Sequence, residues 1–374
     1  MTKINAVEPP SWLLEKSPDR DVILSSRIRF ARNLQQYPFP RRATRSDQSE
    51  LRSAVFESLD TLDFTSSMAR VRVDDQDSIE QRLLVERRLA SQELIDDSCS
   101  GLFYNEEESL SVMINEEDHL RIQAFAAGNR LDEPFQNAYG LERRLDEQLT
   151  YAYHDQWGFL TSCPTNVGTG LRASILLHLP GLVMTQKIER MLRAVSNLGL
   201  TVRGYTGEGS ESRGFYFQLS NQVTLGQSAE AIRDNLKRVA KQVADQERSA
   251  RQALLKSSKV EVEDQIWRSL GILRYAQKIQ SSEALEALSY CRLGIDYGMI
   301  NQCTYQTVDG LLLLIQPAHL IQSVGDQLQS EERDFYRARR LRREVSETDP
   351  TRVNEKDSRE PPESNSCSSE NGPS

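Results

Sequence analysis

The chain has 374 residues, 38% hydrophobic content and a formal net charge of −9, which suits one large or two ordinary domains and disfavours nucleic-acid binding unless basic residues cluster. No stretch reaches the roughly 18 uninterrupted apolar residues of a membrane helix, and the N-terminus lacks the apolar core of a signal peptide, so we expect a cytoplasmic protein. The five cysteines are scattered without CxxC spacing, which predicts reduced thiols and no zinc site.

The N-terminal part of the chain offers the first candidate site. Residues 1–20 show no periodic pattern, and we expect them to be irregular. From Asp21 to Leu34 apolar and basic side chains alternate as in a strand, which puts Arg27 and Arg29 on one face. Two neighbouring guanidinium groups repel each other unless an anion or carboxylates lie between them. This face is therefore either exposed, which the pattern alone favours, or a binding site.

The next elements are predicted from apolar spacing and from capping residues. Helical spacing indicates a helix over 46–59, and a second helix begins after Asp77, with Glu80 completing a capping box. We expect a loop over 94–97 and then a compact strand over 110–114.

Three consecutive acidic residues follow that strand. Glu116, Glu117 and Asp118 are hard to bury without partners. One interpretation is a charged turn at the surface. The other is a carboxylate which, with Arg121 beside it, orients or deprotonates a cationic substrate.

A thiol, a proline, two glycines and an arginine lie within ten residues, from Cys163 to Arg172. Pro164 and the glycines allow an irregular backbone with exposed amides, which suits anions. Such amides and a nearby arginine would favour the thiolate of Cys163. The alternative interpretation is a glycine-rich turn ahead of a buried strand over 171–179.

Two strands, over 200–203 and 215–219, flank a polar loop that contains Glu208. This loop is either a mobile surface segment or a lid that carries a carboxylate onto a substrate. A helix is predicted from Ser228 to about Glu247.

The C-terminal part has a different composition. Residues 257–345 carry apolar stripes at helical spacing, which indicates a second, helical domain. Its last helix contains Arg333 and Arg337 one turn apart with Asp334 beside them, a pattern that alone favours an ordinary charged surface helix. The tail after 345 is poor in apolar residues and cannot support a core, so we expect it to be disordered.

Four separated segments together resemble the phosphagen kinase family of ATP:guanidino phosphotransferases, in the order typical of that family: Ser26–Arg29, Asn115–Arg121, Cys163–Arg172 and Arg203–Glu208. The resemblance implies an α+β fold whose catalytic domain is an antiparallel β-sheet flanked by helices. The predicted organisation is an irregular segment (1–20), the catalytic domain (21–250), an all-helical domain (255–345) and a disordered tail (346–374).

The resemblance also implies roles for individual residues. Glu117 and Glu208 match the two carboxylates that bind the substrate guanidinium in the family. Cys163 matches the thiolate that lies next to this guanidinium and forms no covalent intermediate. Magnesium would be held through the nucleotide and water, without a protein ligand. Leu176 stands where small-molecule relatives place an adenine-contacting histidine, which leaves the adenine contacts open. The residues that match the ATP-phosphate ligands are all arginines: Arg27, Arg29, Arg121, Arg172 and Arg203.

The extra helical domain lies at the C-terminus, and only 24 residues precede Ser25. This arrangement resembles the bacterial protein-arginine kinases, the McsB branch, and not the small-molecule enzymes. The C-terminal residues that look like the branch's regulatory phosphoarginine site are Arg333, Asp334, Arg337 and Ala338.

The resemblance implies transfer of the γ-phosphoryl group of ATP to arginine side chains of proteins, marking them for degradation and regulating the stress response. The implied partners are a zinc-finger activator, a heat-shock repressor, the Clp protease machinery and a second copy of the chain. A small-molecule arginine kinase and a non-catalytic phosphoarginine-binding adaptor are the two alternatives.

Overall fold

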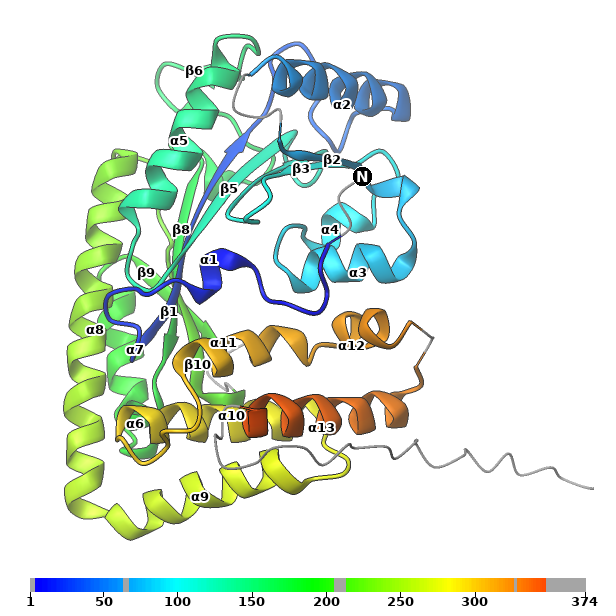
Figure 1. The fold of residues 1–374 in the computed structure, drawn as a ribbon. Coiled ribbons are helices and arrows are strands. Elements are labelled where there is room, and N and C mark those ends of the chain that lie inside the picture. The colour runs from blue at the N-terminus through cyan, green and yellow to red at the C-terminus, as the bar shows by residue number, and fades with distance from the viewer. Residues whose placement is uncertain (1–3, 63–66, 205–212, 326–327, 348–374) are drawn as a thin grey trace, which may run out of the picture.

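The computed structural model describes residues 4–62, 67–204, 213–325 and 328–347. Its centre is an eight-stranded sheet of order β2-β3-β4-β5-β1-β8-β10-β9, in which all neighbouring strands are antiparallel (Figure 1). A separate two-stranded ribbon is formed by β6 and β7. The strands are β1 (Ile23–Arg32), β2 (Ala69–Arg72), β3 (Gly101–Tyr104), β4 (Leu110–Ile114), β5 (Leu120–Ala127), β6 (Tyr153–His154), β7 (Gly158–Phe159), β8 (Leu171–His178), β9 (Leu200–Gly204) and β10 (Tyr216–Asn221).

Helices surround this sheet: the long helix after β10 runs along it, and the helices that follow this one gather at one end (Figure 1). None of the helices in the described ranges is long and apolar enough to cross a membrane. The α-helices are α1 (Ser11–Leu14), α2 (Arg45–Asp60), α3 (Ser78–Glu86), α4 (Gln92–Ile95), α5 (Asp132–Asp146), α6 (Pro180–Met184), α7 (Ile188–Ser196), α8 (Ala229–Ser257), α9 (Lys259–Tyr275), α10 (Ser281–Asp296), α11 (Tyr305–Leu314), α12 (Pro317–Val324) and α13 (Ser330–Glu347).

Side-chain alternation in β1 separates the two faces of the sheet. Ile28 and Phe30 point to one face, where they join the largest hydrophobic cluster together with apolar residues of α2, α5, α7 and α8. Arg27 and Arg29 point to the opposite face. This opposite face is covered by α3 and α4 over β2, β3 and β4, and by helices of the C-terminal part beside Leu24 in β1.

Most of the predicted elements are present. The strand expected within 21–34 is β1, and the helix expected over 46–59 is α2. Asp77 caps α3 as predicted, because its side chain accepts hydrogen bonds from the amides of Ile79 and Glu80. The antiparallel sheet with flanking helices confirms the α+β fold class.

Other local predictions were wrong. A single helical turn, α1, interrupts the segment 1–20, and α4 occupies part of the expected loop 94–97. The helix expected to end near Glu247 continues to Ser257, since Ala250 and Leu254 extend its buried stripe. The strands β2, β3, β5, β6 and β7 were not predicted, and the tail from 348 onward lies outside the described residues.

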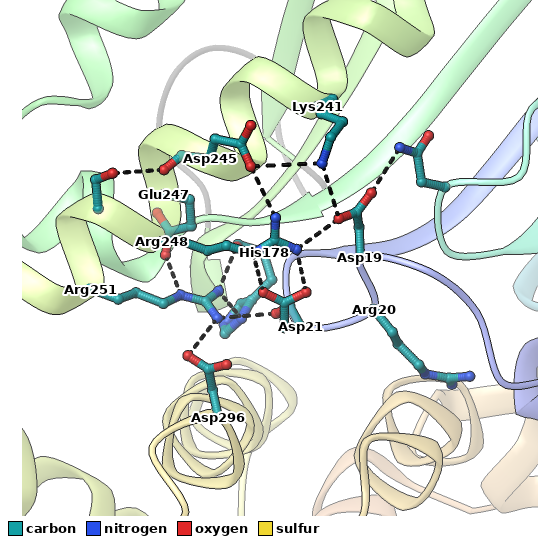
Figure 2. Close-up of polar contacts among 12 residues, drawn as sticks. Asp19, Arg20, Asp21, His178, Lys241, Asp245, Glu247, Arg248, Arg251 and Asp296 are labelled. Atoms are coloured by element: carbon teal, nitrogen blue, oxygen red, sulfur yellow. Dashed lines mark hydrogen bonds and ion pairs between the residues drawn. The ribbon is translucent and has the colours of Figure 1, made fainter.

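A polar junction joins the N-terminal segment to α8 and α10 (Figure 2). Arg248 on α8 forms ion pairs with Asp19 at 2.8 Å and with Asp21 at 2.7 Å. Arg251, one turn later, is buried between Glu247 at 2.7 Å and Asp296 of α10 at 3.1 Å. Because buried charges need partners, these pairs fix how α8 and α10 sit against the chain entering β1.

Candidate active site

The register of the central strands brings the predicted phosphate-binding arginines together. Arg29 of β1 lies directly opposite Arg172 of β8. Ala31, two residues further along β1, lies opposite Arg121 of β5. Directly paired residues in an antiparallel sheet share a face, so Arg27, Arg29, Arg121 and Arg172 all project from the same side.

The fifth arginine reaches this face through the edge strands. Arg203 of β9 pairs with Gln218 of β10, which pairs in turn with Leu176 of β8. Leu176 lies four residues after Arg172 on the same strand and therefore on the same face. The structure thus brings all five predicted arginines to one side of the sheet.

This concentration of cations has an electrostatic cost. Burial, followed by the charges of Arg29, Arg88, Arg121 and Arg172, holds the pKa of Arg27 well below its ordinary value. Burial and the charges of Arg121 and Arg172 lower the pKa of Arg29 to about 9, so Arg29 is still a cation at neutral pH. A bound polyanion would relieve this repulsion.

Carboxylates border the arginines. Arg121 donates from Nη1 to Glu116 at 2.5 Å and from Nη2 to Glu117 at 3.2 Å. Glu116 is buried, whereas 38% of the Glu117 side chain is exposed. Glu117 can therefore face a substrate while Glu116 holds Arg121 in place.

Asp118, the third acidic residue, has a structural role. It is fully buried, and its Oδ1 accepts from Asn33 Nδ2 at 2.7 Å and from the Ser162 amide at 2.6 Å. The charged surface turn considered as an alternative is therefore wrong for Asp118 and Glu116. Asp118 ties the acidic segment to the chain just ahead of Cys163.

The cysteine lies within reach of the same charges. Burial, then the charges of Arg203 and Arg121, lower the pKa of Arg172, while Cys163 and Glu117 act in the opposite direction. Cys163 is partly buried, and it precedes one 3-10 turn, Pro164–Asn166. Cys163 and Glu117 therefore lie close enough to Arg172 to influence its charge.

The predicted second carboxylate, Glu208, lies in 205–212, outside the described residues. The described chain reaches this segment at Gly204, the end of β9, and leaves it at Arg213, two residues before Phe215. The lid interpretation of this loop accordingly stays a prediction.

The C-terminal element is described fully. Arg337 is only 2% exposed, and it donates to the carbonyls of Ile315 and Ile279, both at 3.1 Å, and to Asp334 at 2.5 Å. Arg333 is partly exposed and donates to the Leu328 carbonyl at 3.0 Å. The guanidinium of Arg337 is therefore already hydrogen-bonded to acceptors within the protein. Ala338 is buried against the helical cluster.

One residue of this face was missed by the sequence reasoning. Arg88 follows α3, has φ of 64° in the left-handed region, and its carbonyl accepts from Gln123 Nε2 at 2.7 Å. It lowers the pKa of Arg27 and, with Trp12 and Leu176, lines a small, partly open pocket. The sequence offered only a basic residue at a helix end, so the signal was too general to identify it.

Within the described residues, no group of three or more His, Cys, Asp or Glu side chains is arranged to hold a metal ion. The arginine-lined face instead suits the phosphate oxygens of a nucleotide, which can bring its own magnesium.

Comparison with known protein families adds an independent line of evidence. Residues 50–250 match the model described as ATP:guanido phosphotransferase, C-terminal catalytic domain. Residues 259–357 match the model described as Protein-arginine kinase McsB C-terminal domain.

Curated relatives resemble most of the chain. A protein-arginine kinase of Brevibacillus brevis is 45% identical over 89% of this chain and 94% of its own length. The protein-arginine kinase of Bacillus subtilis is 43% identical over 89% of this chain and 92% of its own length.

Solved structures share the fold. A lombricine kinase aligns with a TM-score of 0.56 and 23% identity, covering 66% of this chain and 70% of that one. The substrate-free duplicated taurocyamine kinase of Schistosoma mansoni aligns with a TM-score of 0.57 and 19% identity, covering 87% and 52%. At these identities the likeness concerns the fold alone.

Proposed function

Because the chain belongs to the protein-arginine kinases of the ATP:guanido phosphotransferase family, we propose that the arginine-lined face of its sheet is where phosphoryl transfer takes place. The observation that carries this proposal is the convergence of five arginines from β1, β5, β8 and β9 on one face. These arginines bind the phosphates of ATP and stabilise the charge of the γ-phosphoryl group as it moves.

Glu117 and Cys163 bind the substrate guanidinium, and Glu208 is the proposed second carboxylate. Its attacking nitrogen forms the N–P bond as the bond from the γ-phosphorus to the bridging oxygen breaks and ADP leaves. The proton lost from that nitrogen passes to a carboxylate, for which Glu117 is available because its side chain is partly exposed. The carboxylates and the thiol align the planar guanidinium with the phosphoryl group, which is the main source of rate.

Magnesium would be bound through the nucleotide and water, and would offset the negative charge of the phosphates. The arginines remain the protein's contribution to binding them. Omitting magnesium while keeping ATP should abolish turnover, and unchanged turnover in the presence of a chelator would contradict this role.

The test of the function uses the full chain with Mg-ATP and an unfolded, arginine-rich protein. We expect acid-labile phosphate on arginine, detected by mass spectrometry under conditions that preserve N–P bonds. Glu117→Gln should lower the rate by about 100-fold or more, because it removes a proton acceptor and an aligning charge. Glu208→Ala should likewise abolish activity.

The matched control is Glu106→Gln, which neutralises an exposed glutamate elsewhere. A Glu117→Gln variant with near-normal activity would remove the role assigned to that residue. Rapid turnover of free L-arginine would favour a small-molecule kinase, and phosphoarginine binding without ATP turnover would favour an adaptor.

We also propose that residues 21–250 catalyse phosphoryl transfer and that residues 255–345 regulate it. In the regulatory part, Arg333, Asp334, Arg337 and Ala338 bind phosphoarginine. The match of residues 259–357 to the C-terminal model supports this assignment.

The cellular setting rests on the same family relationship. The phosphorylated proteins are marked for degradation by the Clp machinery in the cytoplasm, as part of the stress response. A zinc-finger activator, a heat-shock repressor and a second copy of the chain are the proposed partners. Co-purification with and without ATP, and light scattering of the isolated protein, test these associations; absence of all of them under both conditions would contradict the proposal.

A further inference from the structure

The segment between β10 and α8 lies against the loop that carries the active-site thiol. The Thr224 side chain is remote from this loop in sequence, yet its hydroxyl lies 2.7 Å from the Val167 carbonyl and 3.0 Å from the Thr165 carbonyl, and can donate to either. The carbonyl of Thr224 accepts from the amide of Thr169 at 3.0 Å and from its hydroxyl at 3.2 Å. A single residue thus contacts three positions of the loop from 163 to 169.

Asn221, at the end of β10, makes the matching contacts on the other side. Its Oδ1 accepts from the Ala173 amide at 2.8 Å, and its Nδ2 donates to the Leu171 carbonyl at 3.0 Å. These two groups flank Arg172 in the chain. The same Nδ2 also lies 3.2 Å from the carbonyl of Val223, next to Thr224.

The loop from 163 to 169 is also held by hydrogen bonds at its N-terminal end. The Ser162 amide is held by buried Asp118, and the Thr161 hydroxyl donates to the Cys163 carbonyl at 2.8 Å. Downstream of Cys163, Gly168 exchanges backbone hydrogen bonds with Phe159 at 2.8 and 3.2 Å. The Thr224 hydroxyl adds contacts to the Thr165 and Val167 carbonyls, between Cys163 and that backbone pair.

The fit between the two segments is tight. Gly168 has φ of 110°, and a Cβ at this position would lie 2.5 Å from the Thr224 carbonyl oxygen. Since that oxygen belongs to the backbone, a side chain at 168 would push the loop away from Thr224.

The contact also lies outside the hydrophobic core. Thr224 is 5% exposed, whereas its neighbours Val223 and Leu225 are 43% and 42% exposed. The position of Thr224 is therefore held by polar contacts, and a change of its side chain should alter the loop more than the stability of the whole domain.

We infer that the hydrogen bonds of Asn221 and Thr224 together fix the position of the loop from 163 to 169 relative to Arg172. Thr224 is thus a positioning residue for phosphoryl transfer. The inference rests on the proposed function, because it assigns Cys163 to the guanidinium and Arg172 to the phosphates. A displacement of about 1 Å between reacting groups can cost about 100-fold in rate.

The experiment compares Thr224→Val, which keeps the shape and removes the hydroxyl, with Thr224→Ser, which keeps the hydroxyl. We expect Thr224→Val to lower kcat by about 10-fold to 100-fold with little change in the KM for ATP, because the phosphate-binding side chains of β1 and β5 are untouched. Thr224→Ser should retain most of the activity. Leu225→Ser, at an exposed neighbour, is the matched control.

A second readout does not depend on turnover. The alkylation rate of Cys163, followed by mass spectrometry, should change in Thr224→Val and in Gly168→Ala but remain normal in Thr224→Ser. Normal kcat together with a normal alkylation rate in Thr224→Val would overturn the inference, as would equal losses in the Val and Ser variants. If the unmodified chain fails to phosphorylate arginine, the proposed function fails, while the alkylation comparison still decides whether Thr224 holds the loop.

Discussion

Neighbouring arginines of one strand have opposite roles because successive side chains point to opposite faces. Arg27 and Arg29 face the candidate active site. Arg32 points the other way, where it pairs with Glu142 at 2.8 Å and its guanidinium lies 3.5 Å from the centre of the Phe159 ring. The spacing of residues within β1 therefore separates arginines that could bind a substrate from one that supports the fold.

Arg333 and Arg337 match the predicted phosphoarginine-binding motif, yet both already donate hydrogen bonds to backbone carbonyls of the protein. Burial, against the opposing effect of Asp334, lowers the pKa of Arg337. Its contacts with two backbone carbonyls leave Arg333 as the more accessible of the two guanidinium groups. Phosphoarginine binding at this element must either use Arg333 or replace contacts of Arg337.

We expect Arg333→Ala to weaken phosphoarginine binding at least 10-fold, because a bidentate cation is lost from the site. Arg337→Ala should abolish binding and also loosen the packing of α13. Isothermal titration calorimetry with free phosphoarginine measures both, with Arg343→Ala as a control at an exposed arginine of the same helix. Equal affinities in all four proteins would reject the site.

At the scale of elements, the end of α3 connects the C-terminal helices to the arginine-lined face. Glu86 accepts from the amides of Ala318 and His319 at 2.8 and 3.1 Å, and from His319 Nδ1 at 2.8 Å, so it caps α12 from another helix. Two residues later, Arg88 lies near enough to Arg27 for its charge to lower the pKa of Arg27. A shift of α12 would therefore displace residues close to the arginines that we propose bind the nucleotide.

Glu86→Gln should lower the free energy of unfolding by about 1–3 kcal/mol, since charge-assisted hydrogen bonds at a helix N-terminus are weakened. Denaturant unfolding followed by circular dichroism measures this change. Glu57→Gln, at an exposed position of α2, should have little effect. An unchanged midpoint in Glu86→Gln would show that α12 is held by apolar packing alone.

At the scale of the whole molecule, three buried histidines link stability to pH. Burial lowers the pKa of His119 and of His319, and for His178 burial and the charges of Arg292 and Arg251 hold it well below the ordinary value. The unfolded chain binds more protons than the folded one below about pH 6.5, the ordinary histidine pKa. The free energy of unfolding therefore falls as the pH is lowered through and below that value.

Each of these histidines contributes a slope of up to about 1.4 kcal/mol per pH unit. Guanidinium unfolding at pH 7.5, 6.5 and 5.5 should show the decline, and His178→Gln should make it shallower. His154→Gln, which removes an exposed histidine, is the control. A stability that is constant between pH 7.5 and 5.5 would contradict the neutral, buried state of these side chains.

A further loss is expected at lower pH from the polar junction. Burial raises the pKa of Asp21, but hydrogen bonds from Arg248 and the charges of Arg248 and Arg251 outweigh it, so the pKa lies below its ordinary value. This carboxylate stabilises the fold above about pH 4 and ceases to do so as the pH falls through its lowered pKa. The same unfolding series extended to pH 3 measures this second step.

The family, the kinase activity and the α+β class could all be predicted from the amino-acid sequence, and the comparisons and the antiparallel sheet confirm these. Short motifs such as Asn115–Arg121 and Cys163–Arg172 carry this information because their residues are close together in the chain. Local alternation was also sufficient to place Arg27 and Arg29 on one face. The roles of the individual site residues stay predictions.

Which residues from distant segments meet became clear from the folded chain and not from its motifs. Strand register placed Arg172 opposite Arg29, long-range packing brought the charge of Arg88 within range of Arg27, and the turn after β10 placed Thr224 against the loop from 163 to 169. It also showed that Arg337 is already engaged. The physical reason is that strand pairing and helix packing depend on the total burial of many side chains, and no local pattern of residues encodes that sum.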